Sequence, residues 1–136
     1  MKKVRTISHK ENLKDKIIKQ GSLLKRKNQL DSELKKIVKV LKKEYEPEKI
    51  ILFGSLLDDT VHEFSDIDLL IIKETSKRPI DRIIEVAQII NPSLGVDLFV
   101  YTPKEIEMLI AEKYTFFTDI FKKGKILYEK RNSRVD

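Results

Sequence analysis

The stretch ILFGSLLDDTVHEFSDIDLLII, residues 51–72, carries the pattern on which the expected fold is built. Two apolar segments, 49–53 and 66–73, have the length and composition of short buried strands. The second segment begins with Asp66 and carries Asp68 two positions later, so two carboxylates interrupt an otherwise apolar strand. Because a buried carboxylate is costly unless it is paired, hydrogen-bonded or bound to a cation, both residues are candidates for a functional site.

Two helices are predicted before these strands. The first covers residues 10–27 and is interrupted by Gly21. The second covers residues 29–45, where leucine, isoleucine and valine recur with helical spacing. Asp31 or Ser32 is the expected cap of the second helix, and Pro47 is expected to end it.

The elements after residue 73 have clear boundary signals. Pro79 suits the first turn of a helix that runs to about Ile90, and VDLFVY, 96–101, is a third strand. Thr102 and Glu105 have the spacing of a capping box, so a helix begins there. A last helix over 114–123, with Gly124 at its C′ position, precedes an extended piece over 125–129. The expected class is therefore α/β (α+β), a small mixed β-sheet covered by helices.

Composition limits the class of protein. The chain has 136 residues, 40% hydrophobic and 37% charged, which is typical of one globular domain. No segment approaches the roughly 18 consecutive apolar residues of a membrane span, and the N-terminus lacks the apolar core of a signal peptide. The absence of cysteine excludes disulfides and zinc sites built on cysteine, so a cytoplasmic location is expected.

Charge is distributed unevenly along the chain. Residues 1–45 hold 15 Lys and Arg against 5 Asp and Glu, whereas residues 46–136 hold 13 against 17. We therefore expect a basic arm or helix over 1–28, the main domain over 29–130 and a disordered tail over 131–136. A basic arm is typical of nucleic-acid binding, but no aromatic residue is interleaved in it, which favours a solvated lysine-rich face.

Asp97 repeats the anomaly of Asp66 and Asp68 on the third strand. Strand side chains alternate between faces, so Asp66 and Asp68 share one face of their strand. If the second and third strands are neighbours, Asp97 lies beside them. Each Asp alone suits a cap, a turn or an ion pair, but two embedded carboxylates on separate apolar strands favour a metal site. Mg²⁺ prefers such oxygens, and two ions about 4 Å apart can clamp the attacking and leaving oxygens of phosphoryl or nucleotidyl transfer.

Gly54 and Ser55 directly follow the first strand. Glycine permits a tight turn and a close approach of the backbone, and Ser55 adds a hydroxyl and an N–H group. If a helix begins after them, its N-terminus would suit a phosphate chain; the alternative is a simple turn that ends the strand.

Together these residues resemble a known family. Gly54-Ser55, ten further residues, Asp66-Ile67-Asp68 and a later strand Asp97 are similar to the nucleotidyltransferase superfamily of DNA polymerase beta, most of all to its small minimal nucleotidyltransferase branch. The resemblance covers about residues 30–130. It implies ATP or another nucleoside triphosphate as donor, two Mg²⁺ ions, and in-line attack on the α-phosphorus with loss of pyrophosphate. It assigns Asp66 and Asp68 to the metals, Asp97 to the catalytic metal and the acceptor hydroxyl, and Gly54 and Ser55 to the triphosphate.

One departure from the family pattern concerns the residues after Ser55. Many members continue with an arginine-rich turn, whereas residues 56–59 here read LLDD. Lys73, Lys77 and Arg78 are candidates for the missing cation, with surface solvation as the alternative role of each.

Three functional hypotheses follow. The first is a Mg²⁺-dependent nucleotidyltransferase that moves a nucleotide, AMP by preference, to a hydroxyl; in the minimal branch this can be a tyrosine of a HEPN-type toxin, which would make the chain an antitoxin. The second is a catalytically weak binding module that neutralises a partner protein. The third is a nucleotidyltransferase directed to RNA by the basic arm. The aromatic residues near the C-terminus are expected to pack in the core or face a partner rather than stack on bases: Tyr101, Tyr114, Phe116, Phe117 and Phe121.

Overall fold

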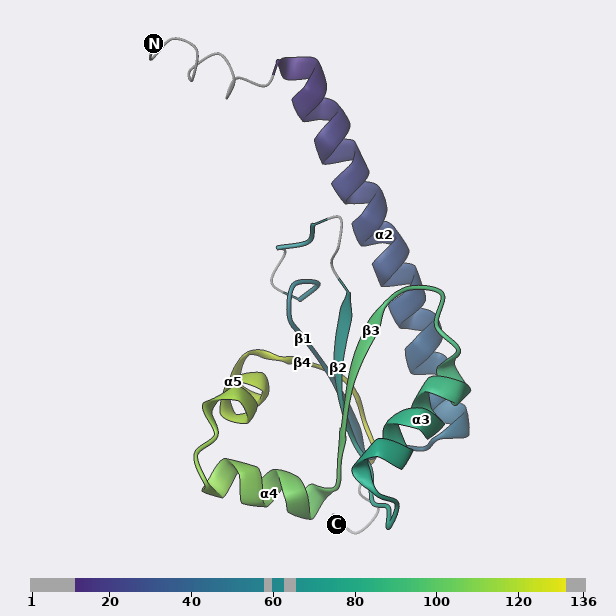
Figure 1. Cartoon of the computed structure of the whole chain (residues 1–136), viewed down its shortest axis with the longest axis vertical. Helices are drawn as coiled ribbons and strands as arrows, with labels where there is room; N and C mark the ends of the chain where they lie inside the picture. Colours follow the sequence, from purple (N-terminus) through teal and green to yellow (C-terminus); the bar gives the residue numbers. More distant parts are fainter. Residues whose placement is uncertain (1–11, 58–59, 63–65, 132–136) are drawn as a thin grey trace.

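The computed structural model of the chain describes residues 12–57, 60–62 and 66–131 (Figure 1). Its elements in chain order are α2 (Leu13–Glu44), β1 (Lys49–Phe53), β2 (Ile67–Ile72), α3 (Pro79–Ile90), β3 (Val96–Tyr101), α4 (Pro103–Ala111), α5 (Thr115–Lys123) and β4 (Lys125–Glu129). Part of the predicted basic arm (1–11), Asp58, Asp59 and the tail after Arg131 lie outside the described residues. The domain boundaries at 28 and 130 stay predictions.

The four strands form one mixed sheet in the order β3-β2-β1-β4, which confirms the predicted sheet type. β1 runs antiparallel to both β2 and β4, whereas β2 and β3 are parallel. β2 lies inside the sheet, and every residue of it except Asp68 is buried. The carboxylate of Asp68 is thus the exception in the best-buried strand.

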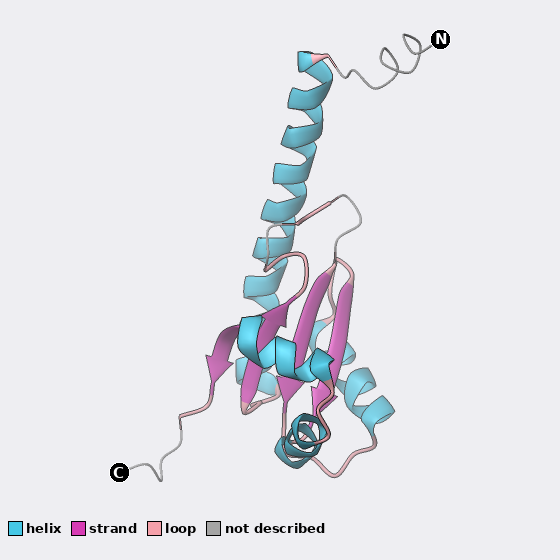
Figure 2. Ribbon diagram, turned by 90° about the vertical axis from the view of Figure 1, so that its left-hand side faces the viewer, coloured by secondary structure: helices cyan, strands magenta, loops and turns pink. Residues whose placement is uncertain are grey.

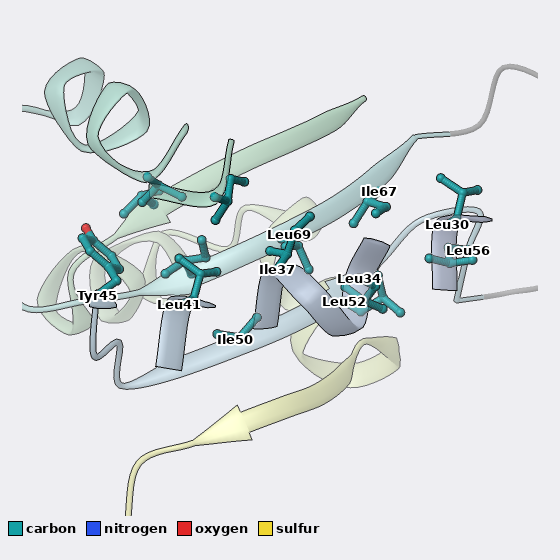
Figure 3. Packing of buried hydrophobic residues seen from close by; sticks show 14 residues of the cluster. Leu30, Leu34, Ile37, Leu41, Tyr45, Ile50, Leu52, Leu56, Ile67 and Leu69 are labelled. Atoms are coloured by element: carbon teal, nitrogen blue, oxygen red, sulfur yellow. The ribbon is translucent and has the colours of Figure 1, made fainter. Parts of the chain in front are cut away.

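Helices cover both faces of the sheet (Figure 2). On one face Ile67, Leu69 and Ile71 pack with side chains of α2 and α3, and Figure 3 shows this cluster from close by. On the other face Leu70 and Ile72 pack with α4 and α5. The alternation predicted from the sequence is confirmed, and it turns Asp68 towards the α4 and α5 side. No helix within the described residues combines the length and apolar composition of a membrane-spanning segment.

The prediction of two N-terminal helices was wrong, because α2 is continuous over 32 residues. Asp31 and Ser32 lie inside it, and the side chain of Asn12 caps it by accepting a hydrogen bond from the backbone N–H of Asp15 at 2.8 Å. Gly21 costs only about 1 kcal/mol in a helix interior, and the surrounding lysine, leucine and glutamine residues favour helix. Packing fixes the C-terminal half, from which the helix extends at low cost.

The N-terminal half of α2 projects beyond the sheet (Figures 1 and 2). At 1.5 Å per residue the whole helix is about 48 Å long, which exceeds what the sheet can cover. Core packing of α2 begins at Leu30, which is fully buried, whereas Leu13 is 73% exposed. The projecting half is therefore not part of the core.

Most later boundaries agree with their sequence signals. Pro79 begins α3, and both hydrogen bonds of the predicted capping box between Thr102 and Glu105 are present. Gly124 ends α5, but with φ −67° it is extended rather than left-handed. A Cβ at Gly124 would lie 2.6 Å from Cγ2 of Ile51, so this position excludes side chains for lack of space.

Candidate functional site

The predicted convergence of carboxylates on the neighbouring strands is present. The register of β2 and β3 pairs Asp68 with Asp97, and Asp66 precedes the pair of Ile67 with Val96. In the antiparallel pair of β1 and β2, Asp68 is also opposite Phe53, so Gly54 follows beside it. One end of three adjacent strands thus brings together the candidate residues of the sequence.

Asp68 is the electrostatic centre of this group. Burial, followed by its hydrogen bond with Asp97 and by the charges of Asp97 and Asp66, raises the pKa of Asp68 from 3.8 to about 6. A carboxyl group held among two other carboxylates binds either a proton or a cation more readily than an isolated one. The site is therefore poised to take up positive charge.

Gly54 provides the space in which the Asp68 side chain lies. Its φ is +81°, in the left-handed region that favours glycine. A Cβ at Gly54 would lie 2.9 Å from Cγ of Asp68 and closer still to its Oδ2. The tight turn and close approach expected at Gly54 are both present, and the group that approaches the backbone here is the Asp68 carboxylate.

The segment after Gly54 forms turns in the part that the structure describes. The N–H of Leu57 donates to the carbonyl of Gly54, and the N–H of Thr60 to that of Ser55, both at 3.1 Å. Residues 54–57 therefore do not begin a helix. The helix N-terminus considered as a phosphate site is not found among these residues, and the turn interpretation holds for them.

Gly95 is a site residue that the sequence reasoning missed. A Cβ there would lie 2.8 Å from Cγ of Asp66 and closer to its Oδ1, so the Asp66 carboxylate rests against Gly95. The signal was present, since Gly95 stands directly before a strand that carries Asp97. The role of Gly95 depends on the register of β2 against β3, which cannot be read from the sequence.

Glu33 is a second residue that was missed. It is a buried acid of α2, and its Oε2 accepts a hydrogen bond from the backbone N–H of Ser93 at 2.6 Å. This bond attaches the loop before β3 to α2 and so fixes the strand that carries Asp97. The sequence signal for this role was a glutamate next to the apolar face of the helix, where a carboxylate needs a hydrogen-bond partner.

Leu56 explains the departure at the position after Ser55. Its side chain is 6% exposed and belongs to the cluster that includes Leu30 and Ile67 (Figure 3). A core residue thus stands where the resemblance predicts an arginine. Asp58 and Asp59 lie outside the described residues.

The three cations proposed as replacements lie elsewhere. Lys73 follows β2 at the end opposite Asp68, five residues or about 17 Å along the strand. Its Nζ donates to the carbonyl of Tyr45 at 2.7 Å and lies 5.0 Å from the centre of that ring. The other two form ion pairs, Lys77 with Glu85 at 2.9 Å and Arg78 with Asp81 at 2.8 Å. Lys77 and Arg78 thus lie in exposed ion pairs at the surface, whereas Lys73 binds the C-terminal end of α2.

The donor set suits a hard divalent cation. Asp66, Asp68 and Asp97 offer carboxylate oxygens only, and these are the ligands that Mg²⁺ prefers. In the described residues, no three His, Cys, Asp or Glu side chains are grouped closely enough to hold a metal ion. The Asp66 carboxylate lies against Gly95 and the Asp68 carboxylate against Gly54. The side chains of Asp66 and Asp68 can rotate, so their carboxylates can bind a cation after a change of rotamer.

Comparison with known proteins shows the family to which the chain belongs. The family model for "Polymerase beta, Nucleotidyltransferase" matches residues 35–133, which is more than half of the chain. A crystal structure at 1.40 Å of a candidate nucleotidyltransferase from Sulfolobus solfataricus is similar, with 20% identity and a TM-score of 0.58 over 80% of this chain and 88% of that one. A toxin–antitoxin crystal structure with AMP-PNP has 24% identity and a TM-score of 0.48 over 71% and 73% of the two chains. Among curated proteins no match to the chain is found.

Proposed function

We propose that this chain, which belongs to the polymerase beta nucleotidyltransferase family, moves a nucleoside monophosphate from ATP to an acceptor hydroxyl. The observation that carries the proposal is the pairing of Asp68 with Asp97 on neighbouring strands, with Asp66 and Gly54 beside them. The motif resemblance assigns the three carboxylates to catalysis and Gly54 to the triphosphate. Membership supports the reaction class, and the geometry supports the residues.

Each residue has a distinct part in the proposed reaction. Asp66 and Asp68 would hold two Mg²⁺ ions, which supply neutralisation of the charge that develops on the phosphates. Gly54 and Ser55 would face the triphosphate. Asp97 is exposed, whereas Asp68 is half-buried, so Asp97 is the carboxylate that an incoming hydroxyl can reach. The hydroxyl oxygen forms a bond to the α-phosphorus as the bond to pyrophosphate breaks, and Asp97 takes the hydroxyl proton.

A partner protein is the proposed source of the acceptor. The projecting half of α2 exposes more than half of four large aliphatic side chains, those of Leu13, Ile17, Ile18 and Leu24. Exposed apolar side chains along one helix are typical of protein interaction sites. We infer that α2 positions a partner, and that a tyrosine of a HEPN-type toxin is the acceptor, which gives the chain an antitoxin role.

RNA is the second candidate partner. Residues 13–28 carry six Lys and Arg and a single acid, Asp15, which favours contact with phosphates. Aliphatic side chains add nothing to phosphate binding, so their exposure on the same helix favours a protein. A cytoplasmic location stays a prediction.

The reaction is tested with ATP labelled on either the α- or the γ-phosphate, together with Mg²⁺ and a candidate HEPN-type partner. Label from the α-position should appear on the partner, and label from the γ-position should leave as pyrophosphate. The variant with Asp66→Ala and Asp68→Ala should neither transfer α-label to the partner nor release γ-label as pyrophosphate. Transfer that survives this double substitution would contradict the catalytic assignment, and neutralisation of the partner without transfer would favour the binding module.

The role of α2 is tested by removing residues 1–28. This truncation keeps Leu30 and the core-facing half of α2. It should abolish transfer to the partner and leave ATP binding intact. If the truncation instead abolishes salt-dependent RNA binding and leaves the partner interaction unchanged, RNA is the acceptor.

A further inference from the structure

A groove begins at Gly54, the glycine against which the Asp68 carboxylate lies, and its residues on α5 have no role in the proposal above. Phe53, Gly54 and Leu57 line it from the end of β1 and the following turn, and Phe116, Asp119 and Lys123 line it from α5. Its volume is about 500 Å³, within the range of small-molecule sites. We propose that this groove binds the donor nucleotide, with Lys123 as the cation for its phosphates and Phe116 as the surface for its base. The inference rests on the proposed function and names the residues of its donor subsite.

The order of the strands decides which substrate uses this groove. In the order β3-β2-β1, Asp97 and Gly54 lie on opposite sides of Asp68. The acceptor hydroxyl approaches Asp97, so an in-line reaction places the leaving pyrophosphate on the other side. That side is the one occupied by Gly54 and the groove.

Charge favours Lys123 as the residue that contacts phosphate. The described turn 54–57 contains no cation, and Lys73, Lys77 and Arg78 are held elsewhere by their partners. Lys123 is exposed at the last turn of α5 and lines the groove together with Gly54. No hydrogen bond or ion pair engages it within the described ranges. A triphosphate in the groove would supply the missing counter-charge.

Phe116 offers the aromatic surface of the groove. The residue is 45% exposed, although its ring is held edge-on against Phe53 at 5.8 Å and against Phe117 at 5.1 Å between centroids. A ring fixed in this way is available for stacking at low entropic cost. The sequence predicted that Phe116 packs in the core or faces a partner rather than stacking on bases; the present proposal departs from that prediction, because nearly half of the residue is open to the groove.

The spacing along α5 separates the two ends of the donor. Phe116, Asp119 and Lys123 follow one another at intervals of three and four residues, so they share one face of the helix. From Phe116 to Lys123 this face spans about 10 Å. Asp119 lies between them, where a carboxylate can accept hydrogen bonds from ribose hydroxyls but not bind phosphate.

The test compares two adjacent lysines. Lys122 and Lys123 are both exposed in the last turn of α5, but only Lys123 lines the groove. Binding of ATP, tripolyphosphate and adenosine is measured by calorimetry in the presence of Mg²⁺. Lys123→Ala should weaken the binding of ATP and tripolyphosphate about tenfold, the scale of one charge-assisted hydrogen bond, and leave the binding of adenosine unchanged. Lys122→Ala should change none of the three.

Phe116 is tested with the same three ligands. Phe116→Ala should weaken the binding of ATP and adenosine about tenfold and leave that of tripolyphosphate unchanged. Phe116→Leu keeps a large apolar side chain without the aromatic ring, so it shows whether the ring is required. A thermal melt of each variant shows that it is folded.

Two outcomes separate this inference from the proposed function. If wild-type protein transfers α-label but the two lysine substitutions have equal effects on ATP binding, the groove assignment is overturned and the function stands. If the wild-type protein binds no ATP with Mg²⁺, the proposed function fails, and the groove assignment fails with it.

Discussion

Replacing Gly54 by alanine should damage the site more than the fold. A non-glycine residue at φ +81° costs about 1–2 kcal/mol. The new Cβ would also lie 2.9 Å from Cγ of Asp68 and closer to Oδ2. Because these atoms belong to a side chain that can rotate, the collision is relieved by moving the Asp68 carboxylate rather than the backbone. The free energy of unfolding should fall by about 1–2 kcal/mol, which is roughly 2–8 °C in Tm.

The effect on catalysis should be much larger than this loss of stability. A reacting group misplaced by about 1 Å costs on the order of 100-fold in rate. Transfer of α-label from ATP and the Tm measured by calorimetry would show the contrast. A Gly54→Ala protein that keeps more than half of the wild-type transfer rate would refute the reasoning, since Asp68 could then move without consequence.

Two other glycines provide matched controls for Gly54. Gly95→Ala should displace the Asp66 carboxylate in the same way, but Gly95 does not have a positive φ, so transfer should fall with a smaller loss of Tm. A Cβ at Gly21 meets nothing within 4 Å, so Gly21→Ala should leave transfer and Tm unchanged. Slower amide exchange over 13–28 is its expected effect, because alanine favours helix in the projecting half of α2.

Three further predictions concern stability. Because the pKa of Asp68 is raised from 3.8 to about 6, the folded state keeps this proton longer, so stability without divalent cation should fall as the pH rises from about 4 to about 6. The variant Asp68→Asn should not show this loss of stability. The pKa difference corresponds to about 3 kcal/mol, and solvent screening of the part-exposed carboxylate reduces the expected loss at pH 7 to about 1 kcal/mol. Measurement of Tm against pH in the presence of a chelator checks this prediction. Glu105→Gln should lower the free energy of unfolding in urea by about 1–2 kcal/mol, because it removes the charge that faces buried Arg82 at 2.7 Å, although Glu105 itself is partly exposed. Arg82 lowers the pKa of Glu105, so the ion pair stabilises the fold at neutral pH and this stabilisation is lost as the pH falls through the lowered pKa. Equal urea midpoints of Glu105→Gln and wild type at neutral pH would contradict this prediction. Leu56→Arg, which introduces the arginine that the resemblance predicts, should destabilise the fold by about 3 kcal/mol or more because it buries a charge. A variant with wild-type Tm would show that Leu56 is not part of the core.

Local signals were sufficient for the sheet and most of its helices. Pro79 and the capping box of Thr102 and Glu105 mark helix starts by chemistry that acts within one turn, so the structure follows them closely. The convergence of Asp68 and Asp97 was predictable because strand alternation fixes the face of each side chain, and only the adjacency of the strands had to be assumed.

The features that the sequence did not predict depend on distant partners. Continuity of α2 through Gly21 depends on packing that begins at Leu30, which a local propensity scale does not contain. Lys73 was considered for phosphate binding because of its charge, but the antiparallel β1–β2 pair places it at the wrong end of the sheet. The roles of Leu56 and Gly95 likewise follow from what packs against them in three dimensions.

Binding of Mn²⁺, followed by electron paramagnetic resonance with a non-hydrolysable ATP analogue present, tests the central claim most directly. The account predicts that the wild-type protein binds two Mn²⁺ ions and that the variant with Asp66→Asn and Asp68→Asn binds neither, while its Tm at pH 7 stays at least as high as that of the wild type. Equal Mn²⁺ binding by the two proteins would contradict the assignment of these carboxylates as the metal ligands of a nucleotidyltransferase.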